Sequence, residues 1–175
     1  ISKKHNISIE YNDLVTLGVF LTVFLIFNLF SKSFLGDGGS YLLSVYFGLY
    51  LISFSNLYQN LISPYYVCLL LWYPAFENLF SILRRKFVKR GFSTYADNEH
   101  VHHFLFKLLN KNIKKKKLSN SLSGIIINLF NFLFIYFGSN FINNTKVLSL
   151  IIIFSVCFYL FIYFILKKIT INKNE

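Results

Sequence analysis

A run of 39 residues without a charged side chain, from Gly38 to Phe76, constrains the fold of this chain more than any other feature. A membrane-spanning helix needs about 20 apolar residues to cross about 30 Å of hydrocarbon, so this run is too long for one span. The segment 55–60, which reads Ser-Asn-Leu-Tyr-Gln-Asn, interrupts it. The pattern predicts two membrane helices here, one near 41–55 and one near 64–83.

Three further charge-free runs are long enough to form spans, at Leu14–Ser31, Leu118–Thr145 and Val147–Leu166. Hydrophobic residues make up 55% of the chain and charged residues only 14%, whereas soluble domains carry about 25% charged residues. Lipid offers no hydrogen-bond partner to the backbone, so these spans must be helices. The sequence predicts an all-α integral membrane protein with about five transmembrane helices, in a single membrane domain over residues 1–175.

The stretch 84–117 holds eleven of the eighteen Lys and Arg residues and three of the four His. Because Lys and Arg concentrate in cytoplasmic connections, we predict one large basic cytoplasmic loop here, with the 31–40 turn and the 167–175 tail on the same side. That side then holds fifteen basic residues against three on the other. The charges flank apolar runs, which indicates membrane topology and anionic lipid as their cause and argues against nucleic acid.

The two cysteines, Cys68 and Cys157, both lie inside apolar runs. A buried thiol there acts as a small hydrophobic side chain, and two such residues do not form a disulfide framework. The chain begins at Ile1, and no basic segment followed by a short apolar stretch marks a signal peptide. We expect the chain to be the later part of a longer protein.

A glycine-rich segment, Phe34-Leu-Gly-Asp-Gly-Gly-Ser40, precedes the second predicted span. Glycines allow a tight turn and a close approach of the backbone to a ligand. Asp37 would stand at the mouth of a helix, where its carboxylate could hold Mg²⁺ together with phosphate oxygens of a substrate. The alternative is an interhelical turn with a solvated carboxylate.

Glu77 lies in the third predicted span, three residues after Pro74. With Arg84 near the cytoplasmic surface, seven residues of helix place Glu77 about 10 Å inward. A carboxylate inside a membrane is costly and is by default a sign of function. The alternative is a structural ion pair with an Arg or Lys of the loop.

Three histidines, His100, His102 and His103, follow the acidic residues Asp97 and Glu99. Their spacing suits neither one helical face nor one strand face, and favours a loop or the start of a helix. Metal ligation is one option, but zinc sites normally show better-defined spacing. Binding of a phosphate-rich substrate by these histidines, with Arg84 and Arg85 among the neighbouring cations, fits better. A merely solvated basic loop stays open as the other interpretation.

In series, these motifs resemble the C-terminal half of the polyprenyl-phosphate N-acetylhexosamine-1-phosphate transferase family, of the MraY/WecA type. The family pattern has a Phe-Asn pair, a Phe-x-Gly-Asp-[Ala/Gly]-Gly-Ser turn, a Pro-x-x-[Asp/Glu] span with paired Arg, and an Ala-Asp…His-x-His-His loop. The corresponding residues are Phe27-Asn28, Phe34 to Ser40, Pro74 to Glu77, Arg84-Arg85, Ala96-Asp97 and His100 to His103.

The resemblance implies an enzyme of the bacterial inner membrane, multi-pass, with its active face in the cytoplasm. Such an enzyme transfers an N-acetylhexosamine 1-phosphate from a UDP-sugar to polyprenyl (undecaprenyl) phosphate, in the first step of lipid-linked cell-envelope glycan synthesis, and uses Mg²⁺ or Mn²⁺. A homodimer stays open. By this resemblance Asp37 would hold the metal and His100, His102 and His103 would bind pyrophosphate or sugar as catalytic residues. Substrate contacts would come from Asn28, Phe34 (on uracil), Gly36, Glu77, Arg84, Arg85 and Asp97.

Two other interpretations compete with the transferase. A non-enzymatic membrane scaffold or transporter fragment predicts that Asp37 and the histidines lie far apart, and a zinc-dependent membrane hydrolase is a third option. The paired aspartates of the transferase family belong to its N-terminal half, which this chain lacks. We therefore expect these 175 residues alone to be inactive.

Overall fold

The computed structural model describes residues 2–30, 32–89 and 99–171, and within these ranges the chain is helical with no strand. In chain order the elements are α1 (Ser2–Leu29), α2 (Gly36–Leu57), α3 (Pro64–Arg84), the π-helical turn η1 (Arg85–Lys89), α4 (Val101–Ile113), α5 (Lys116–Ser139) and α6 (Thr145–Ile171). They form two compact units, Ile1–Leu42 and Leu43–Glu175, which are described separately below.

Among the residues that the structure describes, four helices are long and apolar enough to cross a membrane: Gly36–Leu57, Pro64–Phe87, Lys116–Ser139 and Thr145–Thr170. The apolar part of α1, Leu14–Leu29, is shorter. The most apolar of the spans is α6, with a mean hydropathy of 2.6. The predicted all-α, multi-pass membrane fold is thus confirmed: of about five predicted spans, four are full-length helices and the first is a shorter apolar helix.

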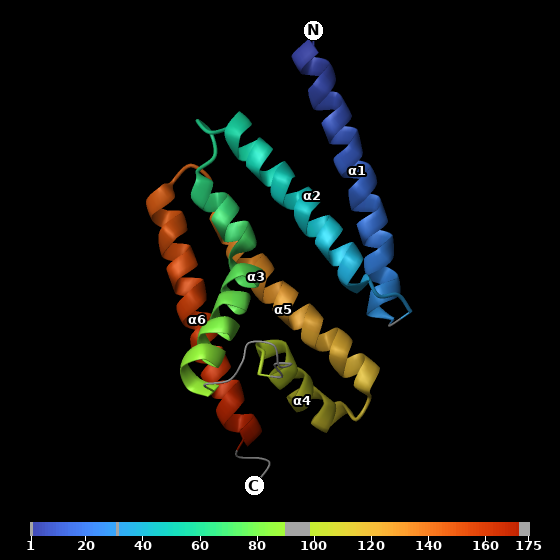
Figure 1. Cartoon of the computed structure of the whole chain (residues 1–175), viewed down its shortest axis with the longest axis vertical. Coiled ribbons are helices and arrows are strands. Elements are labelled where there is room, and N and C mark those ends of the chain that lie inside the picture. The colour runs from blue at the N-terminus through green and yellow to red at the C-terminus, as the bar shows by residue number, and fades with distance from the viewer. Residues whose placement is uncertain (1, 31, 90–98, 172–175) are drawn as a thin grey trace. The chain divides into compact units, whose positions relative to one another are not determined.

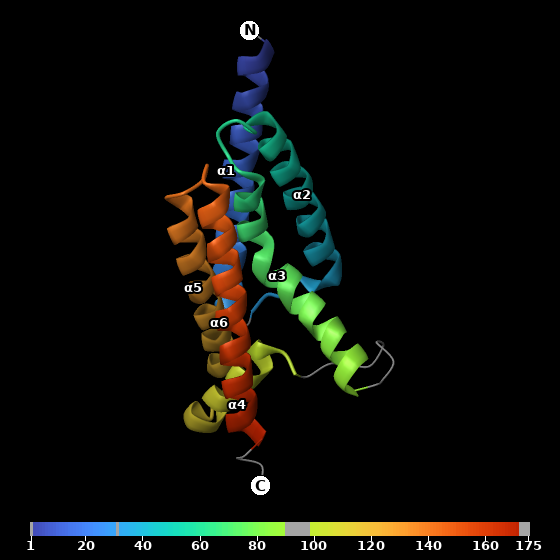
Figure 2. The same cartoon turned by 90° about the vertical axis from the view of Figure 1, so that its left-hand side faces the viewer.

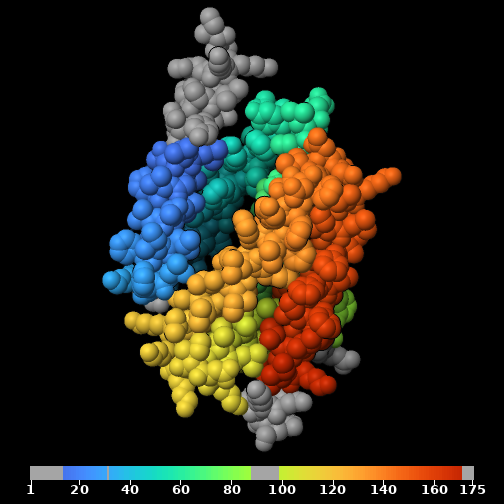
Figure 3. Space-filling model, turned by 180° about the vertical axis from the view of Figure 1, so that it is seen from behind, coloured from blue at the N-terminus to red at the C-terminus, as the bar shows by residue number. Residues whose placement is uncertain are grey.

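Large apolar side chains cover the outside of the helices as well as the core. In α6 the most exposed are Leu150, Ile153, Phe154, Phe161 and Phe164, each between 59% and 64% exposed. Much of the surface in Figure 3 is formed by α5 and α6, drawn in orange to red. Water would penalise such a surface, whereas hydrocarbon does not, so these faces fit a lipid environment.

The second unit is built on α3, α4, α5 and α6, which pack against one another (Figures 1 and 2). A short turn makes α5 and α6 an antiparallel hairpin, and the backbone N–H of Ser63, which precedes α3, donates to Ile142 O in that turn at 2.9 Å. Aromatic rings fill the interior, often edge to face as ring quadrupoles prefer. The buried apolar residues are Leu69, Trp72, Val101, Phe104, Leu148, Tyr159 and Tyr163.

The second half of the predicted basic loop 84–117 contains a helix between the membrane spans, since Val101–Ile113 forms α4. Val101 and Phe104 are buried in the first turn of this helix, whereas Lys107 and Lys111 farther along it are exposed. The dense positive charge masked this apolar periodicity. Lys114 ends the helix in the left-handed conformation (φ 56°), and α5 begins two residues later.

Gly138 in α5 is placed where α3 and α6 come closest to it. A methyl group built at this position would lie 2.2 Å from Leu69 Cδ2 and 3.5 Å from Leu148 Cδ2. Both leucines are fully buried, so they cannot move aside freely. We expect Gly138→Ala to destabilise the protein by about 1–3 kcal/mol, the usual cost of overpacking, as seen in the thermal unfolding midpoint in detergent.

Gly124 provides the matched control on the same helix, since a methyl group built there meets nothing within 4 Å. Gly124→Ala removes the flexibility of a mid-helix glycine without a clash and is expected to leave the midpoint unchanged or raise it. Equal midpoints for the Gly138 and Gly124 variants would contradict the close packing of α5 on α3.

Candidate functional site

Glu77 of α3 faces the beginning of α4 in the second unit. Its Oε1 atom lies 3.4 Å from His100 Nδ1 and 3.8 Å from His102 Nδ1. The Glu77 side chain is 12% exposed, that of His100 22% and that of His102 47%. The carboxylate therefore meets two histidines where the sequence left open an ion pair with an Arg or Lys.

The three histidines gather at the N-terminus of α4, so of the two places that their spacing favoured, a loop or a helix start, the structure has the helix start. His100 is the N-cap residue and makes no side-chain capping bond, so its ring is turned toward Glu77 rather than to the helix. The rings of His102 and His103 are 4.1 Å apart, and those of His100 and His102 are stacked at 5.4 Å. A helix N-terminus carries partial positive charge, which favours anions nearby.

Two tyrosines complete the surroundings of the Glu77 carboxylate. Tyr73 stands one helical turn before Glu77 on α3, and Tyr159 comes from α6; the side chains of both interact with the carboxylate. Oε1 itself is buried, and within the described residues no donor meets hydrogen-bond geometry toward it. One oxygen of the carboxylate is thus left with acceptor capacity directed at the imidazoles.

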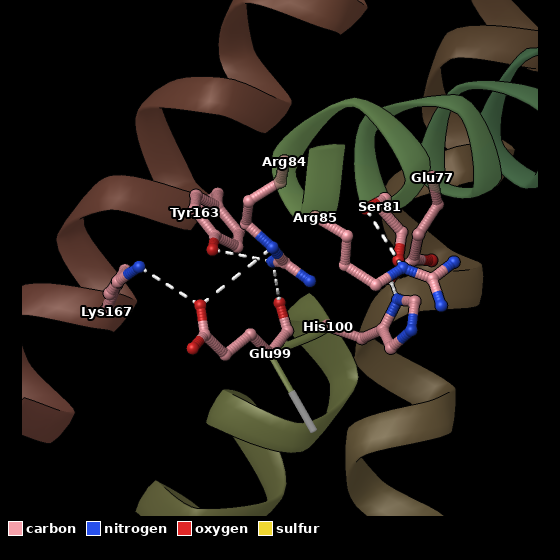
Figure 4. A network of polar contacts seen from close by, with 8 residues as sticks. All are labelled: Glu77, Ser81, Arg84, Arg85, Glu99, His100, Tyr163 and Lys167. Atoms are coloured by element: carbon pink, nitrogen blue, oxygen red, sulfur yellow. Dashed lines mark hydrogen bonds and ion pairs between the residues drawn. The ribbon is translucent and has the colours of Figure 1, made fainter. Parts of the chain in front are cut away.

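Arg84 anchors the segment that leads into α4 (Figure 4). Its side chain is 5% exposed, donates from Nη1 to the carbonyl oxygen of Glu99, and donates to the Tyr163 hydroxyl at 2.6 Å. The guanidinium also lies over the Tyr163 ring, 5.5 Å from its centre. Lys167 of α6 holds the Glu99 carboxylate at 3.1 Å. The residue directly before His100 is therefore fixed from both α3 and α6.

The Arg85 side chain points away from Glu99, Tyr163 and Lys167. Its Nε donates to the carbonyl oxygen of Ser81 at 3.3 Å, so the side chain runs back along α3 (Figure 4). The guanidinium thereby comes within roughly one helical turn of Glu77. The two arginines were predicted as equal substrate contacts, but Arg84 is engaged in holding the fold whereas Arg85 is only half-buried.

The glycine-rich turn lies in the first unit, where Asp37 occupies the first turn of α2 as predicted and is exposed. Gly36 adopts φ +69°, which L side chains rarely adopt. The Asn28 side chain donates to Ser33 O at 2.9 Å and braces the turn, and Phe34 is 74% exposed. Asn28, Phe34, Gly36 and Asp37 are thus gathered on one turn. Asp97 lies outside the described residues.

Sequence reasoning missed Tyr73, Tyr159, Tyr163 and Lys167. For Tyr73 a signal was present, because a residue four positions before Glu77 shares its helical face. For Tyr159 and Tyr163 there was none, since tyrosines are common in the apolar runs of this chain and only tertiary packing brings these two to α3 and α4.

Comparisons of the chain with protein-family models, with curated proteins and with solved structures found no match.

Proposed function

We propose that this chain is part of a membrane transferase that moves an N-acetylhexosamine 1-phosphate from a UDP-sugar to a polyprenyl phosphate, with Mg²⁺ as cofactor. An oxygen of the lipid phosphate attacks the sugar-linked phosphorus of the UDP-sugar. The bond from that phosphorus to UMP breaks, and UMP leaves. The reaction would take place at the cytoplasmic face of a bacterial inner membrane, in a multi-pass protein.

The observation that carries the proposal is the meeting of Glu77, which lies inside the membrane helix α3, with His100 and His102 at the N-terminus of α4. Phosphoryl transfer depends on positioning and on neutralising charge rather than on covalent chemistry by the protein. Imidazoles at a helix N-terminus, with Arg85 about one turn from Glu77, supply donors and positive charge for a diphosphate. Ionisable groups near hydrocarbon are energetically costly, so their presence there is by default a sign of function.

The glycine-rich turn provides the residues proposed to bind Mg²⁺ and the nucleobase. Asp37 presents an exposed carboxylate at the start of α2, and Phe34 presents an exposed ring three residues earlier. A hard cation such as Mg²⁺ binds through one or two carboxylates and shares its other positions with substrate phosphates. An exposed aromatic ring is suited to stacking on a nucleobase.

The direct test uses the parent protein, meaning this chain together with the N-terminal half that its motifs lead us to expect. Membranes containing it are incubated with Mg²⁺, undecaprenyl phosphate and a radiolabelled UDP-N-acetylhexosamine, over a panel of sugars. We expect lipid-extractable label and an equal amount of UMP with at least one sugar. Reactions without the lipid phosphate provide the control.

Failure with every sugar, while the protein is folded and present in the membrane, would remove the transferase proposal and leave the scaffold or transporter interpretation. Label that enters lipid without release of UMP would contradict the proposed bond cleavage.

A further inference from the structure

We propose that Glu77, His100 and His102 form a binding site for a divalent transition metal of the zinc type. This site is separate from the Mg²⁺ expected at Asp37, and it does not depend on the transferase reaction.

The geometry of the ligand atoms is the first argument. Glu77 Oε1, His100 Nδ1 and His102 Nδ1 all lie within 4.8 Å of one another. A tetrahedral zinc ion with ligands about 2.1 Å away separates those ligands by about 3.4 Å. The distance from Glu77 Oε1 to His100 Nδ1 is 3.4 Å, and that to His102 Nδ1 is 3.8 Å. Two edges of the coordination polyhedron are therefore present to within a few tenths of an ångström.

The buried oxygen of the Glu77 carboxylate is the second argument. Oε1 lies against the imidazoles of His100 and His102, but no donor in the described part of the chain makes a hydrogen bond of good geometry to it. A buried charged acceptor without a hydrogen bond is unfavourable. A cation bound between Oε1 and the two Nδ1 atoms would satisfy it.

The surroundings of these ligands suit a metal. Tyr73 and Tyr159 interact with the carboxylate, in the manner of the outer groups that orient metal ligands. The ligand set of two imidazoles and one carboxylate is a common set for zinc and other borderline metals, and unlike that of Mg²⁺. The separation between Glu77 on α3 and the two histidines on α4 is fixed, because Arg84 of α3 binds Glu99, the residue before His100.

The net charge of the proposed metal site and its access to solvent indicate which ligand would occupy the fourth coordination position. Neutral imidazoles and one carboxylate leave a bound divalent ion with a net charge of +1, and Arg85 adds a further positive charge nearby. His102 is 47% exposed, so the site reaches solvent on its side. The fourth position is expected to take water, hydroxide or a phosphate oxygen.

Metal content of the purified protein tests the assignment. We would first replace Cys68 and Cys157 by Ser, since both are free and exposed and would bind zinc themselves. The detergent-solubilised protein is stripped with chelator, loaded with Zn²⁺ or Co²⁺ and dialysed. We expect one Co²⁺ per chain with a visible absorption band of four-coordinate character and without thiolate charge transfer.

Matched variants then separate this site from any other. Glu77→Gln and His102→Ala are expected to weaken Zn²⁺ binding at least tenfold in competition with a chromophoric chelator. His103→Ala is the control, because His103 is outside the ligand set. The helical content of each variant, from circular dichroism, shows that it is folded.

Retention of the same affinity in Glu77→Gln would overturn the proposal, and so would the absence of bound metal from the folded protein. Equal losses in all three variants would also overturn it, because a loss in His103→Ala as large as that in the ligand variants would show that the effect is not specific to the proposed ligands. Each readout is metal occupancy, so the outcome is independent of whether sugar transfer is detected.

Discussion

Replacement of Asp37 by Asn is expected to lower the rate of lipid-linked sugar formation by the parent protein at least about 10³-fold. An amide is a weak ligand for Mg²⁺, and metal stabilisation of transferring phosphates is worth several kcal/mol, or several factors of ten. The measurement is the initial rate of label transfer at saturating UDP-sugar.

The same substitution is expected to leave the fold unchanged, because Asp37 is exposed and interacts with the helix mainly through its dipole, worth less than about 1 kcal/mol. Thr22→Ala is the control: it removes the exposed bond from Thr22 Oγ1 to Gly18 O in α1 and should retain full activity. Asp37→Glu, which keeps the charge, should recover part of the rate when Mg²⁺ or Mn²⁺ is raised. Undiminished turnover of Asp37→Asn would remove the metal assignment.

The second large effect is expected from Arg84→Leu. This change removes the buried donor that serves the Glu99 carbonyl oxygen and the Tyr163 hydroxyl, and each buried polar group left unsatisfied typically costs about 1–3 kcal/mol. We expect unfolding in detergent to shift to lower temperature or lower denaturant by a corresponding amount. Trp72, the single tryptophan, is 5% exposed in the core of the same unit, so its fluorescence reports the transition.

Arg84→Lys tests whether charge alone is enough. Lysine keeps the positive charge but lacks the planar fork that contacts both the Glu99 carbonyl and the Tyr163 hydroxyl, so only part of the stability should return. Lys86→Leu is the matched control, since Lys86 is exposed on the following turn and its loss should shift stability by no more than about 0.5 kcal/mol. Equal effects of Arg84→Leu and Lys86→Leu would show that burial of Arg84 has no structural role.

The membrane fold could be predicted from the sequence because charge-free runs of about 20 residues are a one-dimensional signal. The break predicted at 55–60 lies at 58–63, and the break predicted near 140 lies at 140–144. Helices α2, α3 and α6 cover the predicted spans and extend them by up to five residues, whereas α1 begins twelve residues earlier than predicted and α5 ends six residues earlier. α4 was missed because its apolar residues are interspersed with lysines, and only the packing against α5 and α6 shows which of them face inward.

The residues of the site could be predicted from the sequence, but the contacts between them could not. The sequence identified Glu77, the histidines and the paired arginines, since polar groups between apolar runs are conspicuous. Which of these polar residues contact one another depends on tertiary packing. Arg84 of α3 and Tyr163 of α6, for example, are hydrogen-bonded although they are 79 residues apart in the sequence. The contact of Glu77 with His100 is a result of where the packing places the start of α4 against α3.

The π-helical turn Arg85–Lys89 has a consequence for how the length of this chain can vary. A π turn already accommodates one residue more than an α turn, so deletion of a single residue there can be absorbed locally. A deletion between Pro74 and Glu77 would instead rotate everything upstream of it by about 100° relative to Glu77. Length variants of α3 should therefore be tolerated after Arg84 and rejected before Glu77, which a deletion scan scored by protein yield would resolve.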